Sequence, residues 1–162
     1  MKEVLDLRIN VYDTRLDEDR KNVLVKEYSK NYPSEKDLNT PKKIMDMMNK
    51  IFLADMQPEE HLWVIAMDTK CHPIGVFDVA KGSVNSCIVS PREIFIRLCL
   101  CGAACFGLIH NHPSGDVTPS KEDKEFTERI AEAGKILNIK CVDHIIIGDS
   151  YYSFSEKRRF NK

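Results

Sequence analysis

Hydrophobic residues fall into short, separate runs, and the spacing within each run predicts its secondary structure. Continuous or alternating apolar runs of roughly four to eight residues are typical of strands. Such runs occur at residues 62–67, 73–79, 86–89, 106–109 and 141–147. Apolar residues at helical spacing predict helices at residues 40–52, 91–104 and 120–137. Because strands and helices interleave, we expect an α/β (α+β) fold with a mixed β-sheet flanked by helices.

The predicted helices begin at residues that suit a helix N-terminus. Thr40 precedes Pro41, and Ser90 precedes Pro91. A hydroxyl side chain can accept a hydrogen bond from the free N–H groups of the first turn, where proline is also tolerated. Glu93 would complete a capping box with Ser90.

The chain that precedes the first predicted helix is mostly polar. Residues 31–39 contain a proline among polar residues and predict a loop. A chain of 162 residues is long enough for one compact domain. We place this domain at residues 40–162 and leave residues 1–39 as an N-terminal segment of uncertain structure.

Composition and charge disfavour several classes of protein. Hydrophobic residues make up 43% of the chain and charged residues 30%, which is ordinary for a soluble globular protein. The net charge of −1 does not support a nucleic-acid partner, because dedicated nucleic-acid binders usually carry a basic excess. No apolar run approaches the roughly 20 residues that span a bilayer. The charged N-terminus does not resemble a signal peptide, so we expect no membrane partner and a cytoplasmic location.

The cysteines point to a reduced protein. They form no C-x-x-C pair, which disfavours a zinc ribbon or a disulfide framework. Most lie in apolar stretches, so we expect small, reduced core residues. The six are Cys71, Cys87, Cys99, Cys101, Cys105 and Cys141.

The strongest chemical signal is the pair His110 and His112, where a predicted strand ends and a loop with proline and glycine begins. Side chains at positions i and i+2 of an extended segment point the same way, so both imidazoles can face one ion. Asp123 lies in the first turn of the next predicted helix, and the loop is long enough to bring it toward them. Two imidazoles and one carboxylate suit zinc and leave a fourth position for water, as in catalytic rather than structural zinc sites.

Each part of this pattern also has a simpler interpretation. A single histidine near a strand end is more often a structural residue than a ligand. The pattern Ser120-x-x-Asp123 is commonly only a helix cap. The whole string is more specific, because His110-x-His112 is followed after seven residues by Ser120-x-x-Asp123.

This string matches the JAMM motif of the MPN-domain metalloproteases without a gap, and the chain most resembles the RadC-like branch of that family. The likeness covers residues 42–156 and is carried by the segments SPREIF, HNHPSGDVTPSKED and VDHIIIGD. It implies the JAMM/MPN (JAB) domain fold, one Zn²⁺ per chain bound by His110, His112 and Asp123, and a hydrolytic site. RadC-like proteins also carry a DNA-associated helix-hairpin-helix-like region, for which this chain has no Gly-x-Gly hairpin.

The resemblance also assigns residues to catalysis. It asks for a glutamate at the start of a core strand, and Glu60 fits that place, with Glu59 as the fallback. Its carboxylate would take a proton from the metal-activated water and return it to the leaving amine. Ser120 matches the motif serine, whose hydroxyl would stabilise the oxyanion. The simpler interpretation of Glu60 is a solvated carboxylate at a strand end.

Other polar residues near the motif carry weaker expectations. Asp143 and His144 could orient a ligand imidazole from behind, and a purely structural His144 is the alternative. Asn111 should point away from the metal by strand alternation. Ser114 and Asp116 are expected to shape the loop through turn hydrogen bonds.

The leading hypothesis is a zinc-dependent hydrolase of peptide or isopeptide bonds, acting on a protein or peptide that the sequence does not name. The alternative is a RadC-like protein of DNA repair or mobile elements that acts on or near nucleic acid, for which the basic residues 157–159 would offer a small contact. A third candidate, a non-catalytic binding module, is disfavoured by the intact ligand set. The letters HNH do not indicate an HNH nuclease, whose three residues are dispersed over a longer element. Zinc deaminases need H-x-E and P-C-x-x-C, which this sequence lacks.

Overall fold

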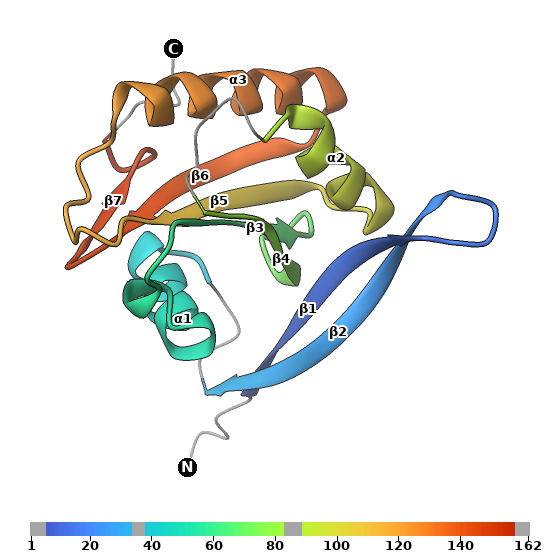
Figure 1. Cartoon of the computed structure of the whole chain (residues 1–162), viewed down its shortest axis with the longest axis horizontal. Coiled ribbons are helices and arrows are strands. Elements are labelled where there is room, and N and C mark those ends of the chain that lie inside the picture. Colours follow the sequence, from blue (N-terminus) through green and yellow to red (C-terminus); the bar gives the residue numbers. More distant parts are fainter. Residues whose placement is uncertain (1–5, 34–37, 83–88, 158–162) are drawn as a thin grey trace.

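The structure is a computed structural model that describes residues 6–33, 38–82 and 89–157. Within these ranges, seven strands form one mixed sheet, and helices pack on both of its faces (Figure 1). The expected α/β fold, a mixed sheet flanked by helices, is confirmed. The strands are β1 (Asp6–Leu16), β2 (Asn22–Pro33), β3 (His61–Met67), β4 (Pro73–Lys81), β5 (Cys105–Asn111), β6 (Lys140–Ile147) and β7 (Tyr151–Ser153). The helices are α1 (Pro41–Phe52), α2 (Pro91–Leu100), α3 (Lys121–Leu137) and a short 3-10 helix, Ala54–Met56.

The topology of the sheet brings three chain segments to one edge. The strand order is β2-β1-β4-β3-β5-β6-β7. β3 and β5 are antiparallel, with Leu62 opposite His110, so the start of β3 lies beside the end of β5. β5 and β6 are parallel, and α3 is the crossover that parallel strands require. The residues before β3, the end of β5 and the N-terminus of α3 therefore meet at the same edge of the sheet.

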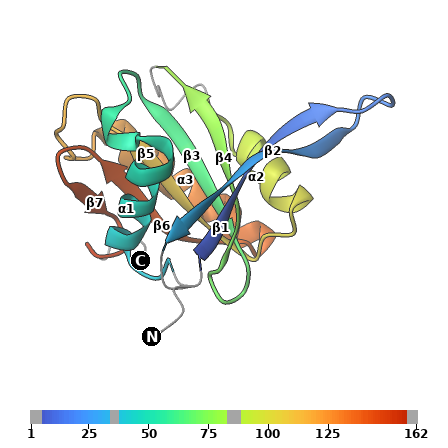
Figure 2. The same ribbon diagram turned by 90° about the horizontal axis from the view of Figure 1, so that it is seen from below.

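The central strands β3 and β5 are buried on both faces, as the continuous apolar runs predict. Because side chains alternate along a strand, neighbouring residues enter two separate hydrophobic cores. Trp63 and Ile65 join the core beneath α1, whereas Leu62 and Val64 join the core beneath α2 and α3. Figures 1 and 2 show α1 on one face of the sheet and α2 with α3 on the other.

Strands β1 and β2 form a long antiparallel hairpin that is not among the predicted strands, although Leu7, Ile9 and Val11 alternate with polar residues in β1. Residues 31–33, predicted as part of a loop, are the end of β2. This prediction is wrong because β2 is held by backbone pairing with β1 and has no buried residue that would give a strong apolar pattern. The hairpin extends from the body of the molecule (Figure 2). It joins the sheet where β1 runs parallel to β4, with Val11 opposite Val76.

The predicted N-terminal cap of α1 is present, whereas the predicted cap and C-terminus of α2 differ from the structure. Thr40 caps α1, since its hydroxyl accepts a hydrogen bond from the Lys43 N–H at 3.3 Å. The side chain of Ser90 makes no capping bond, because the Glu93 N–H is donated to the Ser90 carbonyl oxygen instead. α2 also ends at Leu100, four residues before the predicted end at residue 104.

The predicted strand at residues 86–89 lies largely outside the described residues, and Val89 is in a bend of the backbone.

The described cysteines are all free, but only Cys105 and Cys141 are buried and Cys99 is exposed. The expectation of core cysteines therefore fails for Cys99, which lies on the solvent side of α2 near its end. Cys87 lies outside the described ranges.

Among the described helices, none is long and apolar enough to cross a bilayer.

The apolar residues at helical spacing in α3 are Phe126, Ile130, Ala133 and Leu137, and the buried face of the helix differs from this stripe. The buried face runs through Phe126, Ile130 and Gly134, while Leu137 is 48% exposed. The reason is the close approach that glycine allows. A Cβ atom at residue 134 would lie 2.5 Å from the carbonyl oxygen of Ile139 and 3.4 Å from the Phe106 ring. Gly134 thus lets the backbone of Ile139, just before β6, pack directly against the end of α3.

We predict that Gly134→Ala destabilises the protein. Helix propensity alone would give a gain of roughly 1 kcal/mol. The contact with the Ile139 backbone reverses the sign, and overpacking of this kind costs about 1–3 kcal/mol. The free energy of unfolding, measured by chemical denaturation, tests this. Glu128→Ala, at an exposed position of the same helix, should change that free energy by less than about 0.5 kcal/mol. A more stable Gly134→Ala variant would contradict the packing described.

Candidate metal centre

His110, His112 and Asp123 converge where β5 ends and α3 begins. His110 is the penultimate residue of β5, His112 follows that strand, and Asp123 is in the first turn of α3. Suitable ligand atoms of the three residues all lie within 4.8 Å of one another. The two histidine Nε2 atoms are 2.9 Å apart. The Asp123 carboxylate is 3.3 Å from Nε2 of His110 and 3.6 Å from Nε2 of His112.

The hydrogen bonds of the other ring nitrogens decide what the Nε2 atoms can do. Nδ1 of His112 is 2.6 Å from the Asp116 carbonyl oxygen, which can only accept. Nδ1 therefore carries the hydrogen, and Nε2 of the neutral ring has a lone pair. Nδ1 of His110 lies 2.7 Å from Nε2 of His144, and if it donates there, Nε2 of His110 also has a lone pair. In that arrangement two lone pairs 2.9 Å apart would lie beside a carboxylate and would be stabilised by a cation among them, so this donor set fits a metal ion.

Burial and charge act on the three groups in different directions. Burial lowers the pKa of His110 to about 4, although the Asp123 charge opposes this, so its imidazole is neutral near pH 7. The neighbouring Asp123 carboxylate raises the pKa of His112 against the effect of burial. Burial would raise the pKa of Asp123, but the neighbouring His112 and His110 rings and the hydrogen bonds from Ser120 hold that pKa well below its usual range. The aspartate is therefore ionised and ready to ligate.

The Asp123 carboxylate caps α3 and faces the histidines at the same time. Its Oδ2 atom accepts hydrogen bonds of 2.7 Å from the backbone N–H and from the hydroxyl of Ser120. In return, the Asp123 N–H donates to the Ser120 hydroxyl at 3.0 Å, which completes a capping box. Its Oδ1 atom is the oxygen nearer to His110. The helix cap and the ligand, which are alternatives in the sequence, are thus compatible in one side chain.

The loop after β5 is fixed by backbone contacts with the end of β6. The His112 N–H donates to the Ile147 carbonyl oxygen at 2.8 Å, and the Asp149 N–H donates to Gly115 at 3.0 Å. Gly115 has a φ of +83°, and a Cβ at Gly148 would collide with the Gly115 carbonyl oxygen. The loop therefore depends on two glycines that pack closely together.

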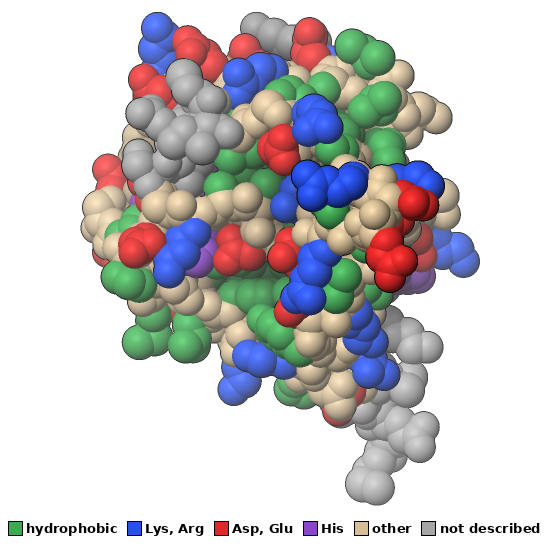
Figure 3. Space-filling view, turned by 45° about the vertical axis from the view of Figure 1, so that its right-hand side comes forward, with side chains coloured by type: hydrophobic (Ala, Val, Ile, Leu, Met, Phe, Trp, Pro, Cys, Tyr) green, Lys and Arg blue, Asp and Glu red, His purple; other side chains and the backbone are tan. Residues whose placement is uncertain are grey.

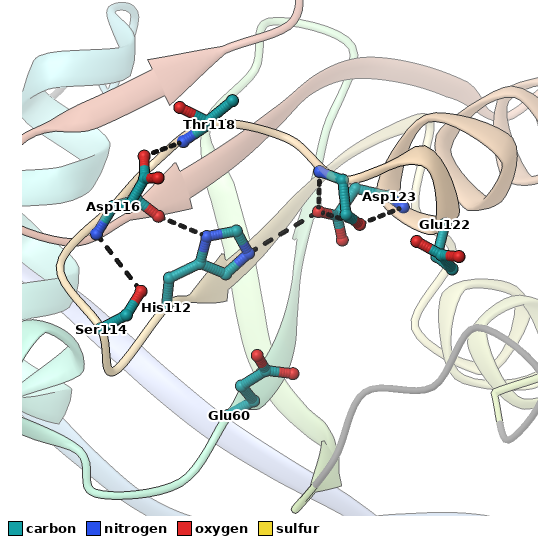
Figure 4. A pocket seen from close by; sticks show the side chains of 8 residues that line it. Glu60, His112, Ser114, Asp116, Thr118, Glu122 and Asp123 are labelled. Atoms are coloured by element: carbon teal, nitrogen blue, oxygen red, sulfur yellow. Dashed lines mark hydrogen bonds and ion pairs between the residues drawn. The ribbon is translucent and has the colours of Figure 1, made fainter.

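Side chains within the loop add turn hydrogen bonds, as expected of Ser114 and Asp116. The Ser114 hydroxyl accepts from the Asp116 N–H at 3.4 Å, and the Asp116 carboxylate accepts from the Thr118 N–H at 2.9 Å (Figure 4). These bonds hold the Asp116 carbonyl oxygen toward His112. The loop thus orients one of the candidate ligands.

Glu60 and Glu59 occupy different environments. Glu60 lines a hollow of about 390 Å³ together with His112, Ser120 and Asp123, and it projects into that hollow from the residue before β3 (Figure 4). Glu59 lies 3.6 Å from the Lys81 ammonium group.

Asn111 fixes the segment that carries both glutamates, a role that the sequence does not reveal. It points away from the histidines, as strand alternation predicts. Its amide oxygen accepts from the His61 N–H at 2.7 Å, and its amide nitrogen donates to the Glu59 carbonyl oxygen at 3.0 Å. Asn111 is almost fully buried. It therefore clamps the backbone on both sides of Glu60.

The Asp143 carboxylate accepts a hydrogen bond from the backbone N–H of His144 at 2.7 Å and not from the His144 ring. The His144 ring reaches His110, but the Asp143 carboxylate accepts from the hydroxyl of Ser153 and the N–H of Ser155 and so ties β6 to the chain after β7. The second partner of the His144 ring is Thr127, at 2.6 Å. Sequence reasoning misses Thr127, although its position four residues after Asp123 places it on the same face of a helix.

Comparison with known proteins identifies the family to which the chain is similar. The family model of the RadC-like JAB domain matches residues 32–159. A UPF0758 protein of Clostridium acetobutylicum is 50% identical over 94 residues, which are 58% of this chain and 41% of that protein. A UPF0758 protein of Clostridium tetani is 50% identical over 100 residues, 61% of this chain and 44% of that protein. A UPF0758 protein of Syntrophomonas wolfei is 40% identical over 117 residues, 71% of this chain and 50% of that protein.

The residues that the family model matches include the whole candidate metal centre. The chain spans about half the length, or less, of these curated relatives. Because the family model covers residues 32–159 and hence most of the sequence, the chain belongs to the RadC-like JAB domain family.

Proposed function

We propose that this protein is a zinc-dependent hydrolase that cleaves peptide or isopeptide bonds. The observation that carries the proposal is the convergence of two imidazole nitrogens and one carboxylate on a single point, beside a hollow that Glu60 also lines. Membership of the RadC-like JAB family is consistent with a metal-dependent hydrolase.

The donor set supports zinc in a catalytic role. Imidazole nitrogens are borderline ligands, so a set of two imidazoles and one carboxylate suits Zn²⁺ better than Mg²⁺ or Ca²⁺, which prefer oxygen ligands alone. A structural zinc site usually closes its shell with cysteines, whereas the three candidate ligands are His110, His112 and Asp123. A zinc ion bound by three protein groups supplies a Lewis acid that lowers the pKa of water toward neutrality.

The residues around the hollow supply the remaining chemistry. Glu60 is placed to accept a proton from the attacking water and to return it to the leaving amine, as a general base and then a general acid. The Ser120 hydroxyl lies at the rim of the same hollow and could donate a hydrogen bond to the oxyanion. In the structure its hydrogen is directed to Asp123, so this role requires the hydroxyl to rotate toward the substrate.

The charge of the hollow favours a peptide over a nucleic acid. Besides Asp123, the side chains of Glu60, Asp116 and Glu122 line it, and these carboxylates would repel a phosphate backbone. On the face in Figure 3, Lys and Arg side chains are interspersed with Asp and Glu. A protein of DNA repair or mobile elements remains the alternative hypothesis, and no contact among the described residues favours it.

We predict about one zinc ion per chain in the purified protein. The double variant His110→Ala, His112→Ala should lose nearly all of it, because two of the three ligands are removed. Elemental analysis after gel filtration measures this. His72→Ala is the matched control, since His72 lies beside Asp68 in the turn between β3 and β4, away from the site. Unchanged zinc content in the double variant would rule out the assigned ligands.

We predict that Glu60→Gln keeps its zinc but loses hydrolysis by roughly a hundredfold to ten-thousandfold in kcat, the usual contribution of a general base. A library of internally quenched peptides, with isopeptide-linked pairs included, provides the assay. Glu59→Gln removes the neighbouring carboxylate and should keep its activity within a few-fold. Loss of zinc from Glu60→Gln would instead place Glu60 among the ligands, and equal losses in the two variants would argue against a specific general base.

A further inference from the structure

His144 is a buried histidine that lies directly behind a candidate ligand. It is 0% exposed and stands in the middle of β6. Its ring stacks on Phe154, with the centroids 5.1 Å apart and the planes at 9°. Its Nε2 atom is 2.7 Å from Nδ1 of His110, and its Nδ1 atom is 2.6 Å from the Thr127 hydroxyl. Packing therefore fixes the ring, and each ring nitrogen has one hydrogen-bond partner.

The Thr127 hydroxyl determines the direction of these hydrogen bonds. Its oxygen is 2.6 Å from the carbonyl oxygen of Asp123, one helical turn earlier. Two oxygens at this distance repel each other unless a hydrogen lies between them, and the carbonyl has none. The hydroxyl therefore donates its one hydrogen to Asp123, and it must accept a hydrogen from Nδ1 of His144.

The protonation of His144 then fixes that of His110. A second hydrogen on His144 would create a cation at a site without solvent and without a carboxylate partner for its ring, which is costly. Nε2 of His144 therefore carries a lone pair and accepts the hydrogen of His110 Nδ1. As a consequence, Nε2 of His110 has its lone pair on the side of His112 and Asp123.

We propose that Thr127 and His144 form a hydrogen-bond relay that holds His110 in the tautomer able to bind a metal through Nε2. This inference rests on the proposed function, since it concerns the same site. The relay runs from the backbone of one candidate ligand, Asp123, through two side chains to another, His110. Reversal of every hydrogen in it would place a hydrogen on Nε2 of His110 and block ligation there. Thr127 and His144 are thus positioning residues and do not touch the metal or the substrate.

Thr127→Val tests the relay, because valine keeps the shape of threonine but offers no hydrogen-bond acceptor to Nδ1 of His144. The affinity for Zn²⁺ alone, measured by competition with a chromophoric chelator, should fall by about tenfold to a hundredfold, the usual effect of losing a group behind a ligand. Thr127→Ser restores the hydroxyl and should bind zinc within a few-fold of the natural protein. Equal affinity of Thr127→Val and the natural protein would overturn the relay, as would equal losses in both variants.

A second measurement needs no variant and no metal. Long-range ¹⁵N–¹H NMR spectra of the metal-free natural protein distinguish the two neutral tautomers of each imidazole. We expect His144 and His110 each to carry hydrogen on Nδ1 and a lone pair on Nε2. Hydrogen on Nε2 of His144 would reverse the relay and overturn the proposal, even if Thr127→Val fails to fold. If the natural protein binds no zinc, the proposed function fails, but these spectra still decide the relay.

Discussion

The candidate site depends on an electrostatic constraint: two imidazole lone pairs face each other at 2.9 Å beside an ionised carboxylate. These groups repel one another, and a cation among them would remove that repulsion. The surrounding hydrogen bonds enforce this arrangement, because His112 is fixed by a backbone carbonyl oxygen and His110 by His144. Burial acts to raise the pKa of Asp123, but its contacts with His112, His110 and Ser120 keep that pKa low. The capacity of the site to hold a metal ion and the local architecture therefore rest on one set of contacts.

The mixed sheet makes these contacts possible. The antiparallel pair β3 and β5 brings the residue before β3 next to the end of β5, and the parallel pair β5 and β6 requires the helix whose first turn holds Asp123. Hydrophobic cores on both faces hold the central strands rigidly. Hydrogen bonds then position single groups, and the clamp that Asn111 makes around Glu60 is one of them. Rigid strands and helix ends, rather than a mobile loop alone, position the proposed chemistry.

The sequence predicts the parts of this structure that follow from short-range patterns. Apolar periodicity predicts α1, α3 and the buried central strands, and the spacing from His110 to Asp123 predicts the convergence at the site. The β1–β2 hairpin is not among the predicted elements, because β2 has no buried residue to give an apolar pattern and the alternation of Leu7, Ile9 and Val11 in β1 is short. Nor does the sequence reveal that Thr127 and Asn111 hold site residues in place, because their partners lie on other elements. The apolar pattern also does not predict the buried face of α3 through Gly134, because a glycine that packs against a backbone has no apolar side chain.

The convergence of the three ligands on one metal ion can be tested by diffraction from crystals of the zinc-loaded protein, recorded at the zinc absorption edge. We expect one anomalous peak per chain, about 2.0–2.2 Å from Nε2 of His110, from Nε2 of His112 and from a carboxylate oxygen of Asp123. A map without a peak at this point would contradict this expectation. So would an Asp123 side chain that only caps α3, turned away from both histidines.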